Sequence, residues 1–284
     1  MHSISPPTDY ASWRKEALRL LEARWHPHDV LWNADTQQDF LFEAPAPYAK
    51  AKSGNQIRVS KEFVRLAQAA ACNRHPHRWE LLYRVLWRIT LGGERNLLCI
   101  TTDRDTLQLH KLVKSVKRDV HKMHAFVRFR KVGEDPVTKR ENFVAWFEPE
   151  HRIFAYTADF FVKRFNGMNW SIIGPDESIH WDGQALSLGQ GGSKSNVPEE
   201  DALDELWLSY YKSIFNPARL KLKAMQSEMP KKYWKNLPES VLIEPLSKSA
   251  SQRTNLMLES TPQKPKPALR NKYLNDLKKQ NKAN

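Results

Sequence analysis

The sequence predicts an α+β fold, in which a small, mainly antiparallel sheet is enclosed by helices from the N- and C-terminal flanks. Apolar residues recur at helical spacing from residue 9 to about residue 120. The pattern changes to alternation in "HAFVRFRK" and "NFVAWFEP", and turn residues separate further short segments up to about residue 190. Helical spacing then returns. Helices on both sides of a run of strands are typical of this fold class.

Three helices are expected in the first 91 residues. The first spans 9–25, and a Pro-rich linker at 44–56 separates it from the second, which Ser60 caps. The third restarts near Pro76. It carries an aromatic stripe at i, i+4 and i+8, formed by Trp79, Tyr83 and Trp87. We interpret this stripe as core, with a base-stacking surface as the alternative.

A fourth helix is expected from Asp103 or Asp105 to about Val120. A short buried strand is expected before it at 96–103, with a helical interpretation left open. Apolar residues from Leu109 to Val120 form one face of the fourth helix. The other face is basic and consists of His110, Lys114, Lys117, Arg118 and His121.

The stretch "RDVHKMHAFVRFR", residues 118–130, is where this helix is expected to become the first strand of the sheet. The strand is expected to pair with 142–149 as an antiparallel hairpin. The turn signals are Gly133, Asp135 and Pro136. On the core-facing side we expect Ala125, Val127 and Phe129. On the opposite side we expect Phe126, Arg128 and Arg130, near Trp146 and Glu148.

The expected organisation has three parts. Residues 1–56 hold the N-terminal helix and linker, and residues 259–284 form a basic, disordered tail. Residues 57–258 form the α+β domain, with its sheet core at about 119–190 and C-terminal helices at 199–258.

The 284-residue chain carries a formal net charge of +13, of which residues 262–284 contribute +6. Such a surplus favours polyanions as partners. The two cysteines, Cys72 and Cys99, form no close-spaced motif, which suits a reducing compartment. An apolar leader and an apolar run of about 18 residues are both missing, so a cytoplasmic location without membrane contact is expected. No Walker, Rossmann, nucleophile-elbow or zinc-cysteine pattern occurs, and no cofactor is expected.

Two basic regions with interleaved aromatic residues are candidate nucleic-acid-binding surfaces. The first combines the basic helix face with the strands that follow it, and the second opens at Asn216–Pro217, where a helix N-terminus can receive a phosphate. Cationic groups contact phosphates and aromatic rings stack on bases. A solvated charged exterior is the alternative for both. The candidates are Lys114, Lys117, Arg118, Lys122, Arg128, Arg130, Trp146, Arg219, Lys221 and Lys223.

His121 and His124 are three residues apart, and Glu148 and His151 repeat this spacing. Imidazoles and carboxylates act as general acids and bases, or hold a divalent ion that activates water. The candidate catalytic residues are Asp119, His121, His124, Glu148 and His180. Phosphate or base contacts and structural hydrogen bonding are the alternatives, and no metal site is assigned.

Five blocks of the chain resemble one bacterial family. They are "KSVKRDVHKMHAFVRFR", "FVAWFEPEH", "FFVKRF", "MNWSIIGPDESIHWDG" and "YYKSIFNPARLKLKAMQSEMPKKYWKNLPE", and the likeness runs from about Tyr10 to Met257. The family is an uncharacterised domain described as a DNA metabolism or DNA repair protein. It occurs alone, encoded beside a radical-SAM protein with a helix-hairpin-helix segment, or fused behind a uracil-DNA glycosylase-type domain. This chain contains neither the glycosylase domain nor a radical-SAM cysteine motif, so it looks like the stand-alone form.

The resemblance implies a DNA context and assigns no catalytic residue. The first hypothesis is a DNA-binding accessory that works with a radical-SAM or uracil-DNA glycosylase-type partner. The alternatives are an enzyme that acts directly on a damaged base or DNA end, and an adaptor that binds only protein.

Overall fold

The computed structural model describes residues 2–32, 57–196 and 222–246, together with residues 208, 248 and 252. The chain divides into two units. The first comprises Met1–Glu205 and Lys231–Leu237, and the second comprises Leu206–Pro230 and Pro238–Asn284. The expected linker at 44–56 and tail at 259–284 lie outside the described residues.

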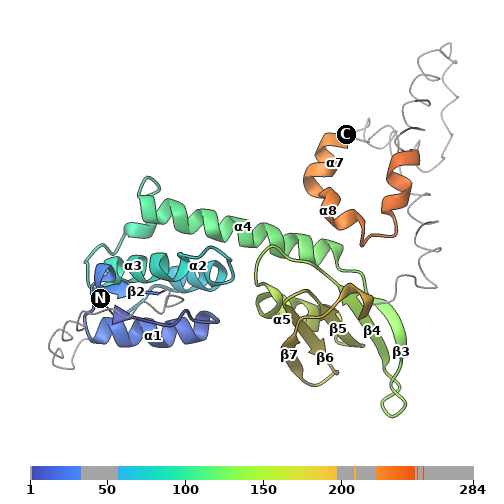
Figure 1. The fold of residues 1–284 in the computed structure, drawn as a ribbon, viewed down its shortest axis with the longest axis horizontal. Helices are drawn as coiled ribbons and strands as arrows, with labels where there is room; N and C mark the ends of the chain where they lie inside the picture. Colours follow the sequence, from blue (N-terminus) through green and yellow to red (C-terminus); the bar gives the residue numbers. More distant parts are fainter. Residues whose placement is uncertain are drawn as a thin grey trace, which may run out of the picture. The chain divides into compact units, whose positions relative to one another are not determined.

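The first unit begins with a helical part that ends in a long helix (Figure 1). Its elements are β1 (His2–Ser3), α1 (Tyr10–Glu22), η1 (Pro27–Asp29), β2 (Val30–Leu31), α2 (Lys61–Ala71), α3 (Arg78–Thr90), η2 (Leu97–Cys99) and α4 (Arg104–Phe126). The sheet part follows, with β3 (Arg130–Glu134), β4 (Glu141–Trp146), α5 (Phe154–Arg164), β5 (Asn169–Ile173), β6 (Glu177–Trp181), β7 (Leu186–Gln190) and η3 (Lys194–Asn196), and the unit is completed by α8 (Lys231–Trp234).

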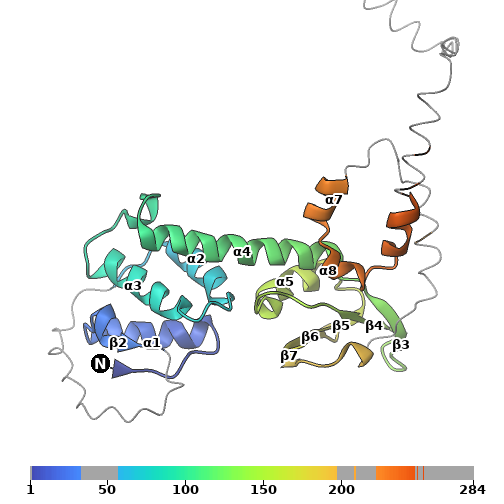
Figure 2. The ribbon, with the colours of Figure 1, turned by 45° about the horizontal axis from the view of Figure 1, so that its top comes forward.

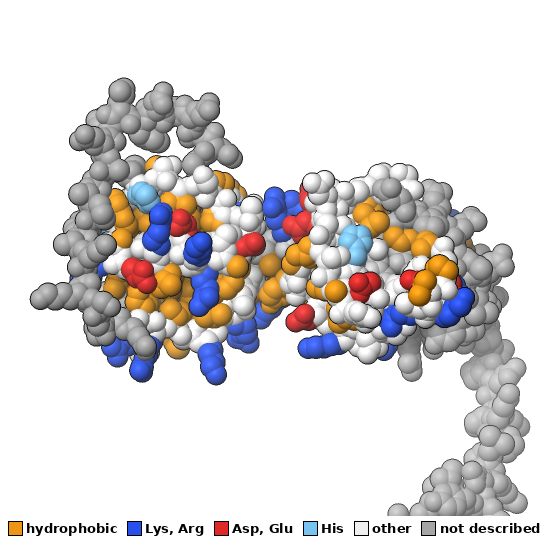
Figure 3. Space-filling view, turned by 90° about the horizontal axis from the view of Figure 1, so that it is seen from below, with side chains coloured by type: hydrophobic (Ala, Val, Ile, Leu, Met, Phe, Trp, Pro, Cys, Tyr) orange, Lys and Arg blue, Asp and Glu red, His pale blue; other side chains and the backbone are white. Residues whose placement is uncertain are grey.

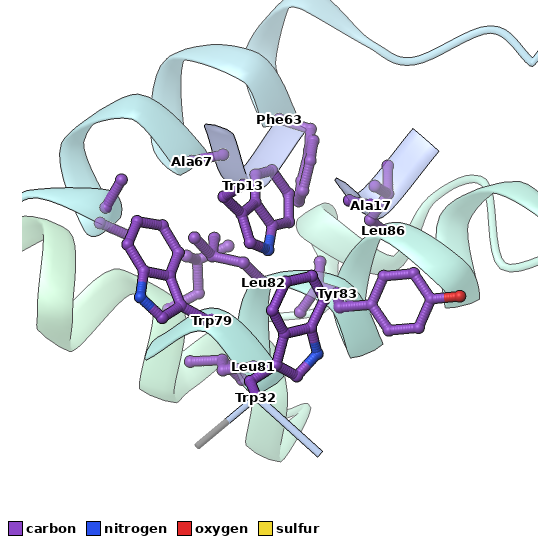
Figure 4. Close-up of a cluster of buried hydrophobic side chains, with 14 of the residues drawn as sticks. Trp13, Ala17, Trp32, Phe63, Ala67, Trp79, Leu81, Leu82, Tyr83 and Leu86 are labelled. Atoms are coloured by element: carbon purple, nitrogen blue, oxygen red, sulfur yellow. The ribbon is translucent and has the colours of Figure 1, made fainter. Parts of the chain in front are cut away.

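Aromatic side chains fill the core of the helical part (Figure 4). Trp13 of α1 stacks on Trp79 of α3, with ring centroids 6.3 Å apart, and also packs against Phe63 of α2. Trp79 and Tyr83 are fully buried, so the aromatic stripe is core, as predicted. The N-terminal helix therefore shares one core with α2 and α3, because its apolar face has no other partner to bury against.

Two predictions about the helical part are corrected. Residues 96–103 contain the short helix η2 and not a strand, because only Leu97 of its three residues is buried. Helix α4 continues to Phe126, beyond the expected end at Val120. Val116, Asp119 and Met123 are all buried, so the inward positions keep a helical period through "RDVHKMHAF". The first strand begins only at Arg130, and Ala125 is exposed on the helix.

The five-stranded sheet confirms the α+β fold class. Its strand order is β3-β4-β5-β6-β7. Strands β3 and β4 form the expected antiparallel hairpin, while β4 and β5 are parallel because the chain crosses over through α5. The remaining pairs are antiparallel, so the sheet is mixed and mostly antiparallel.

Helix α5 covers one face of the sheet. Phe161 of α5 packs against Trp170 of β5, and Ile172 and Ile179 are fully buried on the same side. On its other side α5 contacts the C-terminal half of α4, through Phe160 and His124. Figure 2 shows α5 between α4 and the strands. The basic side of α4 and the second face of the sheet are therefore two separate surfaces.

The described part of the second unit contains helix α7 (Leu222–Glu228) and helical residues 240–246. The last helix was expected to start at Pro245, and it starts before that residue. None of the described helices combines the length and the apolar character that crossing a membrane requires.

Candidate nucleic-acid interface

A row of exposed cations lies along α4. It is formed by Lys111, Lys114, Lys117 and Arg118, which we call the α4 stripe. None of the four makes an ion pair among the residues that the structure describes. His110 and His121 are exposed next to them. The sequence identified three of the four cations from the helical period, and it missed Lys111.

The cations near the start of α4 are engaged differently. Arg88 of α3 forms ion pairs of 2.7–2.9 Å with Glu94, Asp103 and Asp105, and these bonds hold its pKa above the usual range. Arg84 pairs with Glu80 and Asp105. These arginines tie α3 to the N-terminus of α4, where acidic side chains are also favoured by the helix dipole. The α4 stripe begins six residues after Asp105, almost two helical turns further, and its cations make no ion pair in the described residues.

Two aromatic rings of α5 lie exposed, and one of them stacks on α4 almost two turns beyond the α4 stripe. The ring of His124 stacks on Phe160 of α5, with centroids 3.7 Å apart and an interplanar angle of 19°. Phe160 is 40% exposed and Tyr156, one turn earlier, is 39% exposed. Neither ring was among the residues predicted from the sequence. Their signal was present, because Phe154, Ala158 and Phe161 occupy the inward side of α5 and leave positions 156 and 160 outside.

The charge distribution differs over the surface. In the view of Figure 3, Lys and Arg side chains gather over the helical part, and uncharged side chains predominate over the sheet part. On this face, therefore, the helical part is the side that attracts a polyanion.

Two cations of the predicted set have structural roles. Lys122 is only 6% exposed, and its amino group lies 5.8 Å from the ring centroid of Phe126. Arg128 donates from Nη1 to the carbonyl oxygen of Ala125 at 2.8 Å, so it satisfies a carbonyl at the end of α4. Neither side chain is placed for a surface contact with phosphate. The reason is that α4 is longer than expected, which turns both residues toward the interior.

The predicted stacking residues on the sheet are not available for stacking. Trp146 is buried and its indole N–H donates to Glu148 at 2.8 Å. Phe126 packs against Tyr233 of α8. Arg130 is half-buried and lies on the sheet face of Val144. Arg219 and Lys221 lie outside the described residues, as does the side chain of Lys223.

Asp119 is a buried acid beneath α8. Its carboxylate is 3% exposed and accepts the backbone N–H of His151 at 2.9 Å. The hydroxyl of Tyr233 donates to it at 3.5 Å. Burial raises the pKa of Asp119 to about 6. A shifted pKa of this kind is common at catalytic sites, but structural networks produce it too.

The surroundings of Asp119 are closed. His151 Nε2 lies 3.0 Å from the hydroxyl of Ser115, which also accepts from the amide of Asn73 at 2.9 Å. The adjacent depression, lined by Arg74, Pro149, His151, Phe154, Pro175, Asp176 and Glu177, has no room for a water-sized molecule. The cluster therefore joins α4 to the segment after β4, and it offers no substrate site in this structure.

The five candidate catalytic residues have separate environments. Asp119 lies under α8, His124 lies against α5, and His121 is exposed on α4. Glu148 accepts from Lys235 and Trp146; burial alone would raise its pKa, and these hydrogen bonds lower it. His180 bonds to two serines on the sheet. Within the described ranges, no three His, Cys, Asp or Glu side chains are grouped so that they could hold a metal ion.

Comparison with known proteins gives a family for this α+β domain. Residues 76–239 match the domain of unknown function DUF4130. The match covers more than half of the chain, which therefore belongs to this family. It includes α4, the complete sheet and α8, and thus the α4 stripe. Searches of curated proteins and of solved structures found no match.

Proposed function

We propose that this protein binds DNA through the α4 stripe and the exposed rings beside it, as an accessory in DNA repair or DNA metabolism. The observation that carries the proposal is a row of four exposed cations that make no ion pair among the described residues, on a helix that packs against two exposed aromatic rings of α5. Cations next to exposed rings are the combination by which proteins hold a nucleic-acid backbone and its bases.

The dimensions of the α4 stripe fit a phosphate backbone. Lys111 and Arg118 are seven residues apart, which is about 10 Å along a helix. This length corresponds to about three nucleotides of one B-form strand. The four side chains can therefore reach successive phosphates, and each contact releases counterions.

An accessory role is supported by the separation of the candidate catalytic residues. General acid-base catalysis needs two or more such groups around one substrate position. Here Asp119 is closed off, and Glu148 is engaged by Lys235. The resemblance to stand-alone proteins encoded beside a radical-SAM protein supports a partner chain that supplies the chemistry.

DNA binding is tested by fluorescence anisotropy of labelled single- and double-stranded oligonucleotides with the purified, nuclease-treated full chain. We expect submicromolar affinity at low salt. The logarithm of the binding constant should fall linearly with the logarithm of salt concentration between about 50 and 200 mM. No binding at about 50 mM salt, or binding that salt leaves unchanged, contradicts the proposal.

The partner is tested separately by co-purification with the radical-SAM helix-hairpin-helix protein or the glycosylase-type protein. We expect one of them to be retained after nuclease treatment. Retention that disappears with nuclease shows that DNA alone connects the two proteins, and it contradicts the accessory role.

A further inference from the structure

The second face of the sheet, opposite α5, contains a hollow of about 590 Å³. It belongs to neither the α4 stripe nor the Asp119 cluster. Six of the side chains that line it come from the four adjacent strands β4 to β7: Asn142, Val144, Asn169, Ser171, His180 and Ser187. Its volume lies within the range of about 300–1,000 Å³ that is usual for ligand sites.

One hydrogen-bond relay ends in the hollow with a donor. Arg140 Nε donates to Asn169 Oδ1 at 2.8 Å, which fixes the orientation of that amide. Asn169 Nδ2 must then donate to Asn142 Oδ1, at 2.9 Å. The amide N–H groups of Asn142 therefore point away from this bond, and they make no hydrogen bond among the described residues.

Arg140 is itself held firmly. Its Nη2 donates to the carbonyl oxygens of Asn166 and Met168, at 2.5 and 3.2 Å. Its guanidinium passes over Gly183, where an added Cβ would lie 2.5 Å from Cζ. Gly183 also has a positive φ of 92°, so a glycine is required there for two reasons. The relay thus starts from a rigid anchor.

A second relay ends in the hollow with an acceptor. Ser178 donates its hydroxyl to the carbonyl oxygen of Gln190 at 2.8 Å, so it can only accept from His180 Nε2, at 2.9 Å. A neutral His180 then has its proton on Nε2, and its Nδ1 accepts the hydroxyl of Ser171 at 2.8 Å. Ser171 lines the hollow, and its hydroxyl oxygen can still accept a hydrogen bond.

The hollow carries little charge. Asp182, at its edge, is engaged as an acceptor for the backbone N–H groups of Gln184 and Ala185. Arg140 is engaged by its three oxygen partners. Val144 and Ile173 add apolar surface on the same face. Most of the side chains that line the hollow are uncharged, and the carboxylate of Asp182 already accepts two hydrogen bonds, so an uncharged occupant is favoured.

We propose that the hollow binds an unpaired nucleobase, with Asn142 donating to a ring acceptor and Ser171 accepting from a ring or amino N–H. Asparagine and serine read base edges in this way, and bases taken out of a helix present those edges. The two residues are diagonal neighbours on adjacent strands, because Asn142 pairs with Asn169 and Val144 pairs with Ser171. Such neighbours are roughly 7–8 Å apart, so one planar base that lies between their side chains can contact both. The inference rests on the proposed DNA function only in one respect, which is that the base comes from DNA.

The hollow is tested first with free deoxynucleosides, including deoxyuridine, by backbone amide NMR of the full chain. We expect saturable shifts at Ser171 and His180 with at least one nucleoside at millimolar concentration. Asn142→Asp keeps the acceptor for Asn169 and replaces the outward donor by an acceptor, so it should weaken that nucleoside about tenfold. Asn96→Asp makes the same charge change at an exposed position of the helical part, outside the hollow, and should leave the affinity unchanged.

The source of the base is tested with single strands that differ only in carrying bases or being abasic. If removing the bases weakens binding less in Asn142→Asp than in the wild type, a base within DNA is the occupant, because stacking on Phe160 is the same in both proteins. An equal effect of removing the bases in both proteins, with nucleoside shifts retained in the wild type, identifies a free nucleoside. The absence of nucleoside shifts in the wild-type chain overturns the inference, whatever the variants do.

Failure of this inference is distinguishable from failure of the proposed function. Substitutions in the α4 stripe should change the salt dependence of DNA binding and leave the nucleoside shifts intact. Asn142→Asp should weaken the nucleoside shifts and leave the salt dependence of DNA binding intact. A variant that loses both properties while keeping its unfolding temperature contradicts the assignment of two separate surfaces.

Discussion

The imidazole of His124 lies flat against the ring of Phe160, with ring centroids 3.7 Å apart. This contact covers one face of the His124 ring, and the helix continues through Met123, as the spacing of the His121–His124 pair requires. Burial lowers the pKa of His124, so the ring is neutral at pH 7. His124 and Phe160 therefore form a stacked pair of uncharged rings on the side of α4 beyond the α4 stripe.

Replacing Phe160 should weaken binding of single-stranded DNA. Phe160→Ala removes an exposed ring, and base-aromatic stacking contributes about 1–3 kcal/mol per base. We expect the dissociation constant to rise about fivefold to a hundredfold in anisotropy titrations. The salt dependence should stay as in the wild type, because no cation is removed.

Phe160→Leu is the control for packing. It keeps an apolar side chain against His124 and removes only the aromatic face. A leucine variant with wild-type affinity would show that stacking does not contribute, and it would remove α5 from the interface.

Replacing Asp119 should change how stability depends on pH. Its pKa is raised by burial from 3.8 to about 6, so the folded state binds the proton more tightly than the unfolded state. The contribution of the neutral acid to the stability of the folded state is fully present below pH 3.8. It is lost as the pH rises through the folded-state pKa of about 6. Full ionisation costs up to about 3 kcal/mol. Asp119→Asn keeps the acceptor for His151 and should abolish this loss.

The measurement is the free energy of unfolding by urea at several pH values between about 4 and 7. The difference between Asp119→Asn and wild type should grow in favour of the variant as pH rises. Using this difference removes the contributions of Glu177 and the buried histidines, which titrate in both proteins. A constant difference across the range would contradict the raised pKa.

Removing the side chain of Tyr233 should destabilise the first unit, although this residue is far from the sheet in sequence. Tyr233 is buried, and its ring packs on Phe147 and Phe126 at centroid distances of 5.4 Å. Tyr233→Ala should lower the free energy of unfolding by about 3–5 kcal/mol. Tyr233→Phe removes only the long hydrogen bond to Asp119 and should cost less than about 1 kcal/mol. Equal effects of the two variants would show that α8 is not docked through its ring.

Local patterns predicted much of the fold. Ser60 caps α2 by accepting from Phe63, and Asp103 caps α4 by accepting from Asp105 and Thr106. Trp79 and Tyr83 are core, as their spacing indicated. These features depend on neighbours within one or two helical turns, and single-sequence patterns report such neighbours well.

The features that the sequence did not predict depend on distant partners. Alternation in "HAFVRFRK" indicated a strand, but Phe126 is the last residue of α4. Its ring packs against Tyr233, which is more than a hundred residues away in sequence. Trp146 was expected on an exposed face, and its indole is instead bonded to Glu148 next to Lys235. The hydrogen-bond relays to Asn142 and Ser171 also join separate strands, so residue spacing alone contains no signal for them.

The central claim, DNA binding through the α4 stripe, is tested most directly by the salt dependence of two charge-matched variants. One carries Lys111→Gln, Lys114→Gln and Lys117→Gln. The other carries Lys15→Gln, Lys61→Gln and Lys139→Gln, which are exposed lysines elsewhere in the described residues. We predict that the negative slope of log binding constant against log salt concentration becomes shallower by about 2–3 in the first variant only. Equal slopes in the two variants would contradict binding through the stripe.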